Sequence, residues 1–113
     1  MAFVLTDEAG GRPTPPTEGT FCIPRSFTPT AVEAKVGINA SNLYYQLIYQ
    51  LQTHEDCSFA SLSSAMEQFP MEASALSRAF TELRDKGFAS LFGGNTLRTA
   101  TAIRLNTFGE LPR

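Results

Sequence analysis

Apolar residues recur at helical spacing in three segments of the chain. The first of these segments begins at residue 41, and its apolar stripe consists of Leu43, Tyr44, Leu47, Ile48 and Leu51. Steps of three and four residues place all five side chains on one face of a helix, as a face packed on a core requires. Ser41 is suited to cap the N-terminus of this helix, and His54 lies near its C-terminal end. The pattern predicts a core helix that starts at residue 41.

A shorter helix is predicted directly after it. Ser58 is a suitable N-cap, and Phe59, Leu62 and Met66 follow at spacings of three and four residues, with Ala65 beside them. This segment ends before the Phe69-Pro70 pair, because a residue that precedes proline is disfavoured in a helix.

The third helical segment is predicted over residues 72–86. Its apolar positions Leu76, Phe80 and Leu83 are four and three residues apart. Gly87 follows at the position where a helix C-terminus favours a positive φ, and Lys86 complements the helix dipole just before it. Three helices thus follow one another with only short turns between them.

After residue 87 the period of the pattern changes to two. Residues 88–92 are predicted to form a strand, and Gly93-Gly94-Asn95 supplies residues that tolerate the positive φ of a hairpin turn. The return strand alternates over residues 97–105. One of its faces carries Leu97, Thr99, Thr101, Ile103 and Leu105, and the other carries Arg98, Ala100, Ala102 and Arg104. The pattern therefore predicts a β-hairpin over residues 88–105.

The N-terminal third has a different composition. Five of the seven prolines lie within the first 29 residues, and the stretch from Gly10 to Thr17 is typical of an extended tether. Residues 20–23 are compatible with a short edge strand, since Pro24 would confine it to an edge. We therefore expect a flexible, extended arm over residues 1–37 and a folded domain over residues 38–113, which is a suitable size for a single domain. The expected fold class is α+β, with a three-helix core and a β-hairpin.

This order of elements resembles a winged helix-turn-helix domain over about residues 38–106. The third helix is similar to the recognition helix of MarR-type bacterial regulators, because Ser77-Arg78, Leu83, Arg84-Asp85-Lys86, Gly87 and Phe88 occur in the same order. The opening Phe21-Cys22-Ile23-Pro24, followed by Leu43-Tyr44-Tyr45, is similar to some plasmid and phage replication-initiator winged helices. These resemblances imply that helix 72–86 enters the major groove of DNA while the hairpin, or wing, contacts the backbone or minor groove.

The residues on the solvent side of the third helix suit that role. Each residue turns the helix by about 100°, which places small hydroxyl side chains around one arginine opposite the apolar stripe. Small side chains let the backbone approach DNA, and an arginine can bind guanine O6 and N7. Arginines near the tip of the hairpin can enter the minor groove or neutralise a phosphate. The expected DNA-binding residues are Ser74, Ser77, Arg78, Thr81, Asn95, Thr96, Arg98 and Arg104.

The net charge and the absence of metal-binding and catalytic motifs exclude several other classes of protein. The net charge of −2 argues against nonspecific coating of nucleic acid and against a polybasic membrane binder. The basic residues are nevertheless concentrated in the second half: residues 1–57 have three basic and six acidic side chains, and residues 58–113 have six and five. Two cysteines and one histidine cannot form a four-ligand zinc site, and no catalytic motif occurs. We expect no enzymatic activity, no cofactor, no metal and no membrane association.

The sequence therefore predicts a cytoplasmic, sequence-specific double-stranded DNA-binding protein. A single module of this kind buries little surface on DNA, so we expect a homodimer. Regulation of transcription is the first interpretation of its role, and plasmid or phage replication or maintenance is the second. A winged helix that binds a protein partner and no DNA is the alternative of a different class. Cys22 and Cys57 are expected to be reduced thiols, with Cys57 buried as a packing residue rather than acting as a redox sensor.

Overall fold

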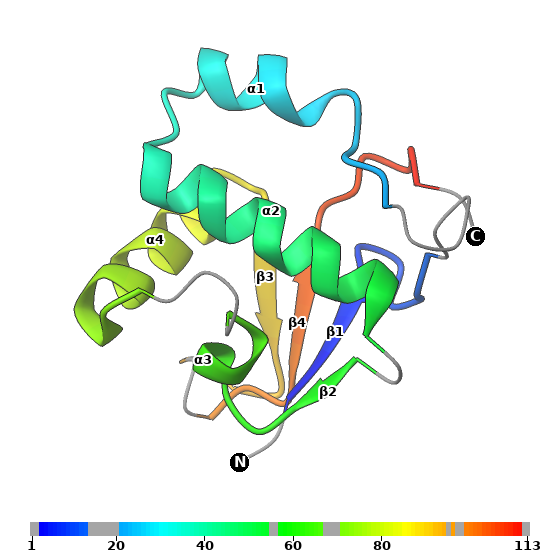
Figure 1. Ribbon diagram of the computed structural model, residues 1–113, viewed down its shortest axis with the longest axis vertical. Coiled ribbons are helices and arrows are strands. Elements are labelled where there is room, and N and C mark those ends of the chain that lie inside the picture. Colours follow the sequence, from blue (N-terminus) through cyan, green and yellow to red (C-terminus); the bar gives the residue numbers. More distant parts are fainter. Residues whose placement is uncertain are drawn as a thin grey trace.

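Helices and strands are both distributed along the whole chain, which makes the fold α+β (Figure 1). The computed structural model describes residues 3–13, 21–54, 57–66, 71–94, 96 and 99–111. The elements in chain order are β1 (Phe3–Asp7), α1 (Phe27–Glu33), α2 (Ile38–Thr53), β2 (Ser58–Phe59), α3 (Leu62–Ala65), α4 (Ala73–Asp85), β3 (Ala89–Phe92) and β4 (Ala102–Leu105).

The sheet is mixed and has the strand order β2-β1-β4-β3 (Figure 1). Strand β1 is antiparallel to β2 and parallel to β4, with Val4 opposite both Ser58 and Ala102. Phe3, Leu5 and Asp7 are buried, whereas Val4 and Thr6 lie on the other face of the strand. Strand β1 is therefore internal to the sheet. The expectation of an extended arm over residues 1–37 is wrong for residues 3–7.

The arm expectation is also wrong for residues 27–33, which form α1. Phe27 is buried, and its ring stacks on the ring of Tyr44 with a centroid distance of 3.8 Å and an interplanar angle of 1°. Of the possible edge strand over residues 20–23, residue 20 lies outside the described residues, and residues 21–23 form no strand. The backbone of Cys22 instead bonds to the side chain of Gln52: its N–H donates to Oε1 at 2.9 Å, and its carbonyl accepts from Nε2 at 2.6 Å. A side-chain amide thus takes the place of a strand partner.

Helix α2 lies across the sheet and supplies more core residues than any other described element (Figure 1). The five residues of the predicted apolar stripe are all fully buried, which confirms it: Leu43, Tyr44, Leu47, Ile48 and Leu51. Each such side chain contributes about 1.5–3 kcal/mol through removal from water. The helix starts earlier than predicted, with Gly37 as N-cap, so Ser41 lies within its first turns. His54 is the C-cap, as its position indicated.

The segment after α2 differs from the prediction. Ser58 does not cap a helix: Ser58 and Phe59 form β2, paired with Val4 and Phe3. Helix α3 begins four residues later, and there the hydroxyl of Ser61 accepts the N–H of Ser64 at 3.1 Å. Phe59, Leu62 and Met66 are nevertheless buried, as their spacing indicated. The apolar positions were correctly identified, but a helical period also fits a two-residue strand followed by a single helical turn.

Helix α4 and the β3–β4 hairpin follow the predicted order. Helix α4 lies within the expected 72–86 range and has Lys86 as its C-cap. Gly87 follows with a φ of +85°, which confirms the positive φ expected at this position. Strands β3 and β4 pair antiparallel, with Ser90 opposite Arg104. The return strand is shorter than predicted, because it begins only at Ala102 and the predicted assignment of faces fails before that residue. Thr99 and Thr101 are exposed, and Ala100 is buried.

Candidate nucleic-acid interface

The solvent-facing side of α4 carries the predicted hydroxyl and arginine residues. Ser74, Ser77, Arg78 and Thr81 are all exposed. The opposite side is buried and consists of Leu76, Ala79, Phe80 and Leu83. Helix α4 packs on α2 and β3 through that buried side, so its position is fixed while its polar side is accessible. We call the four exposed residues the α4 face.

The hydroxyl of Thr81 is engaged within the α4 face. It donates to the carbonyl of Ser77 at 2.9 Å, one helical turn earlier. Its oxygen retains acceptor capacity, but its hydrogen is committed to the helix backbone. Arg78 is therefore the strongest hydrogen-bond donor on the face.

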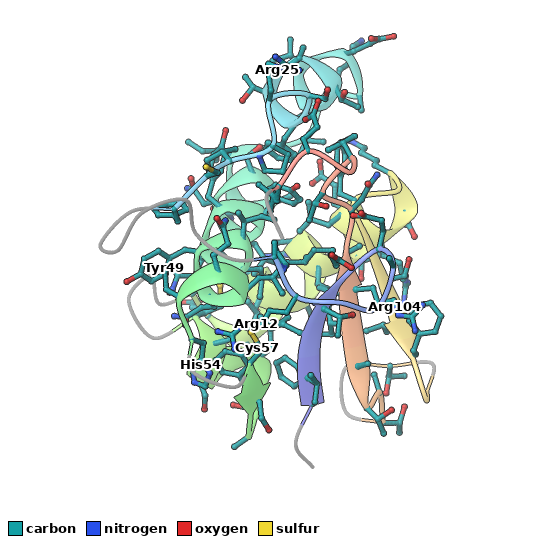
Figure 2. All side chains as sticks on the ribbon, turned by 90° about the vertical axis from the view of Figure 1, so that its right-hand side faces the viewer. Arg12, Arg25, Tyr49, His54, Cys57 and Arg104 are labelled. Carbon is teal, nitrogen blue, oxygen red and sulfur yellow. The ribbon has the colours of Figure 1, made fainter. Side chains whose placement is uncertain are left out.

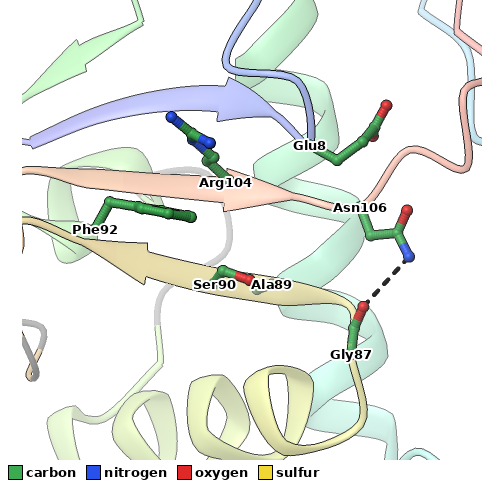
Figure 3. A pocket seen from close by; sticks show the side chains of 7 residues that line it. All are labelled: Glu8, Gly87, Ala89, Ser90, Phe92, Arg104 and Asn106. Carbon is green, nitrogen blue, oxygen red and sulfur yellow. Dashed lines mark hydrogen bonds between the residues drawn. The ribbon is translucent and has the colours of Figure 1, made fainter.

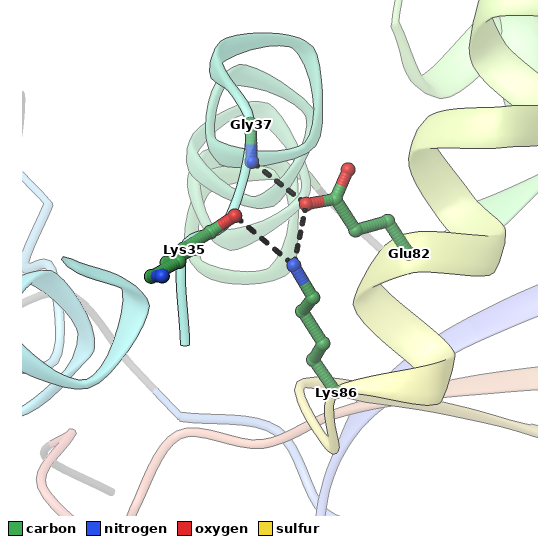
Figure 4. Close-up of polar contacts among 4 residues, drawn as sticks. All are labelled: Lys35, Gly37, Glu82 and Lys86. Atoms are coloured by element: carbon green, nitrogen blue, oxygen red, sulfur yellow. Dashed lines mark hydrogen bonds and ion pairs between the residues drawn. The ribbon is translucent and has the colours of Figure 1, made fainter. Parts of the chain in front are cut away.

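One carboxylate ties α4 to the start of α2 (Figure 4). Glu82 Oε2 accepts the backbone N–H of Gly37 at 2.7 Å and also accepts from Lys86 Nζ at 3.0 Å. Lys86 Nζ additionally donates to the carbonyl of Lys35 at 3.0 Å. The Gly37 N–H, together with Lys86, lowers the pKa of Glu82. The predicted role of Lys86 as a helix-dipole partner is thus extended, because it also bridges α4 to the residues just before α2.

A shallow hollow of about 230 Å³ lies beside this contact. Its walls are the start of α2, including Ile38 and Asn39, and the adjoining side of α4, including Arg78. Ile38 is 77% exposed. Arg78 thus has open space on one flank, which leaves its guanidinium room to reach a ligand placed against α4.

The tip of the hairpin is described only in part. Thr96 is exposed, and its carbonyl accepts the backbone N–H groups of Thr99 at 3.1 Å and Ala100 at 2.9 Å. Asn95 and Arg98, two of the predicted DNA-binding residues, lie outside the described residues. Gly94 packs closely on this turn, since a Cβ there would lie 2.5 Å from the backbone of Thr99.

Arg104 lies apart from the α4 face. It projects from β4 on the side of the sheet away from the helices (Figure 2), where its guanidinium carbon lies 4.0 Å from the centroid of the Phe92 ring. Both side chains line a hollow of about 300 Å³ with Glu8, Ser90 and Asn106 (Figure 3). The structure therefore brings together four of the predicted residues on α4 and places Arg104 on the opposite face of the sheet.

Arg84 is a cation that the sequence interpretation left out of the site. It is exposed on the flank of α4 nearest β3, and its Nε lies 3.7 Å from the carboxylate of Asp85. Surface ion pairs of this kind contribute little. Helical spacing could have predicted that Arg84 is near the site, because Arg84 follows Ser77 by seven residues and therefore lies on the same side of the helix. The position of β3 next to that flank was not predictable from the wheel.

Two carboxylates near the start of the chain form hydrogen bonds to other residues of the fold. Buried Asp7 accepts the N–H groups of Ala9 and Gly11 with one oxygen, at 2.9 Å each. Glu8 accepts from the backbone and hydroxyl of Thr107, both at 2.6 Å. The acidic residues that gave the N-terminal part its negative charge thus include two with structural roles, and the net charge alone is a poor guide to the surface near α4.

The remaining chemistry-bearing residues have structural surroundings. Cys57 is buried, as predicted for a packing residue, and its Sγ lies 3.2 Å from the carbonyl of Leu51. His54 accepts the N–H of Cys57 through Nδ1 at 3.0 Å. Among the described residues, no cluster of three or more His, Cys, Asp or Glu side chains is placed to hold a metal ion. In the same part of the chain, no helix combines the length and apolar character needed to cross a membrane.

No family model, curated protein or solved structure matches the chain. The class of the protein is therefore described from its fold and its candidate interface alone. The protein is an α+β protein in which two successive helices, α3 and α4, precede a β-hairpin, and the second of these helices presents an exposed polar face.

Proposed function

We propose that the protein binds double-stranded DNA in a sequence-specific manner, as a winged helix-turn-helix protein. In this proposal α4 enters the major groove, and the hairpin contacts the backbone or minor groove. The observation that carries the proposal is the α4 face, where Ser74, Ser77, Arg78 and Thr81 are exposed together on a helix that is anchored through its other side.

The chemistry of that face suits base recognition. An arginine surrounded by short side chains can reach guanine O6 and N7, because the helix backbone can approach the floor of the groove. Serine and threonine hydroxyls can bind phosphates or base edges. The acidic residues of α4 do not oppose this contact at its centre, since Glu82 faces Gly37 and Lys86 and Asp85 is the last residue of the helix.

The expected partner arrangement is a homodimer on a repeated or palindromic site. One module of this size contributes limited contact area on DNA, and pairing two modules raises the affinity. Regulation of transcription is the role we favour, and plasmid or phage replication or maintenance is the second.

Fluorescence anisotropy with mixed-sequence duplex DNA at low and moderate salt tests the proposal. We expect salt-sensitive binding that is strongly reduced in Arg78→Ala and in Arg98→Ala. Arg25→Ala is a matched control, because Arg25 is an exposed arginine ahead of α1 (Figure 2) and should leave binding unchanged. Absence of duplex binding at low salt by the folded protein would refute the proposal.

A protein-binding role is the second candidate, and one observation favours it. Phe92 and Val4 are 42% and 40% exposed on the side of the sheet away from the helices. Exposed apolar side chains grouped on one surface are typical of protein interaction sites. If the folded protein binds no duplex, this surface becomes the leading candidate for function, and Phe92→Ser is the variant that should weaken partner binding.

A further inference from the structure

A groove separates the C-terminal half of α4 from β3. It has a volume of about 330 Å³ and is lined by Arg84, Ala89, Ser90, Leu91 and Gly94. Its walls thus come from α4, from β3 and from the first residues of the hairpin connection. The groove joins the side of α4 that bears Ser77 to the start of the hairpin tip.

Strand β3 presents backbone donors to this groove. It is an edge strand, because it pairs only with β4 in the order of the described sheet. The carbonyls of Phe88 and Phe92 accept from Asn106 and Thr101, both at 2.9 Å, on the β4 side. Backbone groups alternate in direction along an antiparallel strand. The N–H groups of Ala89 and Leu91 consequently point toward the free edge, where the groove lies.

Arg84 supplies a positive charge on the opposite wall. Its side chain is 41% exposed, and its contact with Asp85 at 3.7 Å is long for an ion pair. An exposed pair of this kind is held only weakly, so the guanidinium can turn to an anion in the groove. Arginine is well suited to a phosphate, because its planar donors match two phosphate oxygens.

We propose that this groove binds a backbone phosphate of the DNA duplex, between the segment read by α4 and the segment contacted by the hairpin. Arg84 donates to the phosphate from one wall, and the Leu91 N–H and the Ser90 hydroxyl donate from the other. Backbone N–H groups at a sheet edge are known to form anion-binding concavities. The inference rests on the proposed function and adds to it a contact that fixes the orientation of the duplex without reading its sequence.

The carboxylate of Asp85 provides a second test of the phosphate site. Asp85 lies beside Arg84 at the end of α4 and both competes for its guanidinium and repels a phosphate. Removal of the Asp85 charge should therefore strengthen binding, whereas removal of the Arg84 charge should weaken it. Opposite effects from adjacent residues are not expected from a general loss of folding.

The experiment compares Arg84→Gln and Asp85→Asn with Arg25→Gln as control, using anisotropy titrations of the full chain with mixed-sequence duplex over a range of salt. We expect Arg84→Gln to reduce affinity about three- to tenfold and to lower the salt slope by about one. Asp85→Asn should bind more tightly than the parent chain. Thermal unfolding of each variant shows whether it remains folded.

Amide NMR provides a second measurement. On addition of duplex, the N–H resonance of Leu91 should shift in the parent chain and shift much less in Arg84→Gln. An unchanged affinity and salt slope in folded Arg84→Gln would overturn the phosphate site, and if Arg78→Ala still abolished binding, the proposed function would stand. Absence of duplex binding by the parent chain would instead remove the proposed function, and this site with it.

Discussion

The side-chain amide of Gln52 bonds to both backbone polar groups of Cys22, at 2.9 and 2.6 Å. Gln52 is buried, and its Nε2 also donates to the carbonyl of Ile48 at 3.2 Å. One side chain on α2 therefore fixes the segment that leads to α1. Gln52 lies next to Leu51 on the core side of α2. The contact between Gln52 and Cys22 therefore forms only when the segment around Cys22 packs against α2.

Replacement of Gln52 should be costly. Gln52→Ala leaves the two backbone groups of Cys22 without their partner, and we expect the free energy of unfolding to fall by about 2–3 kcal/mol. Urea denaturation followed by circular dichroism measures the change. Gln50→Ala is a suitable control on the same helix, because Gln50 is only half-buried. Equal losses in the two variants would contradict the assigned role of Gln52.

Acid should destabilise the protein through Glu82. The pKa of Glu82 is lowered below its ordinary 4.5, because the Gly37 N–H and Lys86 bind the carboxylate. Its stabilising contribution is therefore present above pH 4.5 and is lost as the pH falls through the lowered pKa. Urea unfolding as a function of pH should show this loss, and Glu82→Gln should make the acid side of the profile shallower.

A control for the acid prediction is Glu33→Gln, at an exposed position on α1. The contact between Glu82 and Gly37 is intact in this variant, so it should keep the acid dependence of the parent chain. Glu110 adds to the same trend, because the backbone N–H and hydroxyl of Ser26 lower its pKa. An unchanged acid profile in Glu82→Gln would show that its contact with α2 does not contribute.

Alkali should destabilise the protein through Tyr44. Burial raises the pKa of this phenol above its ordinary 10.0, and the charges of Glu8 and Glu110 add to the rise. Its contribution is complete below pH 10.0 and is lost at higher pH, because the unfolded chain ionises first. Tyr44→Phe should therefore reduce the loss of stability above pH 10.0 in unfolding measurements.

The same variant also loses a hydrogen bond at neutral pH. The Tyr44 hydroxyl donates to the carbonyl of Asn106 at 2.7 Å, so Tyr44→Phe should cost about 1 kcal/mol. Tyr45→Phe is the matched control, since the Tyr45 hydroxyl makes a long contact of 3.4 Å with the exposed Thr28 hydroxyl. If the two variants were equally stable, the bond to Asn106 would be of no consequence.

Gly94 should be intolerant of a side chain. A Cβ at this position would lie 2.5 Å from the backbone of Thr99, so Gly94→Ala must displace one side of the hairpin connection. We expect a loss of about 1–3 kcal/mol in the free energy of unfolding. In Gly87→Ala, by contrast, the Cβ meets none of the described residues within 4 Å, and the cost comes from the positive φ. Crystallography or NMR of Gly94→Ala should show the displacement near Thr99.

The elements that could be predicted are those whose signal lies within one segment. The apolar stripe of α2 and that of α4 each lie within one continuous segment, and Gly87 directly follows the end of α4. Hydrophobic periodicity was therefore sufficient to predict these two helices. Strand β1 was missed because its partner β4 lies almost at the other end of the chain, with Leu5 opposite Ile103. Nothing in five residues beside a proline-rich stretch indicates such a distant partner.

The candidate interface was predictable to the same extent. Ser74, Ser77, Arg78 and Thr81 were found from one helix wheel, because their exposure depends only on which side of α4 is apolar. Arg104 was placed on the correct side of β4, but its stacking on Phe92 depends on the register of the hairpin. The groove beside Arg84 depends on how α4 and β3 pack, which a pattern along the chain does not contain.

The internal position of β1 has a consequence for biosynthesis. Residues 3–7 are synthesised before β4, which is one of the two strands that flank them in the sheet. Until then the apolar side chains Phe3 and Leu5 lack the sheet in which they are finally buried. The sheet can close only after β4 has been synthesised, so this fold forms after synthesis of the hairpin rather than progressively from β1 onward.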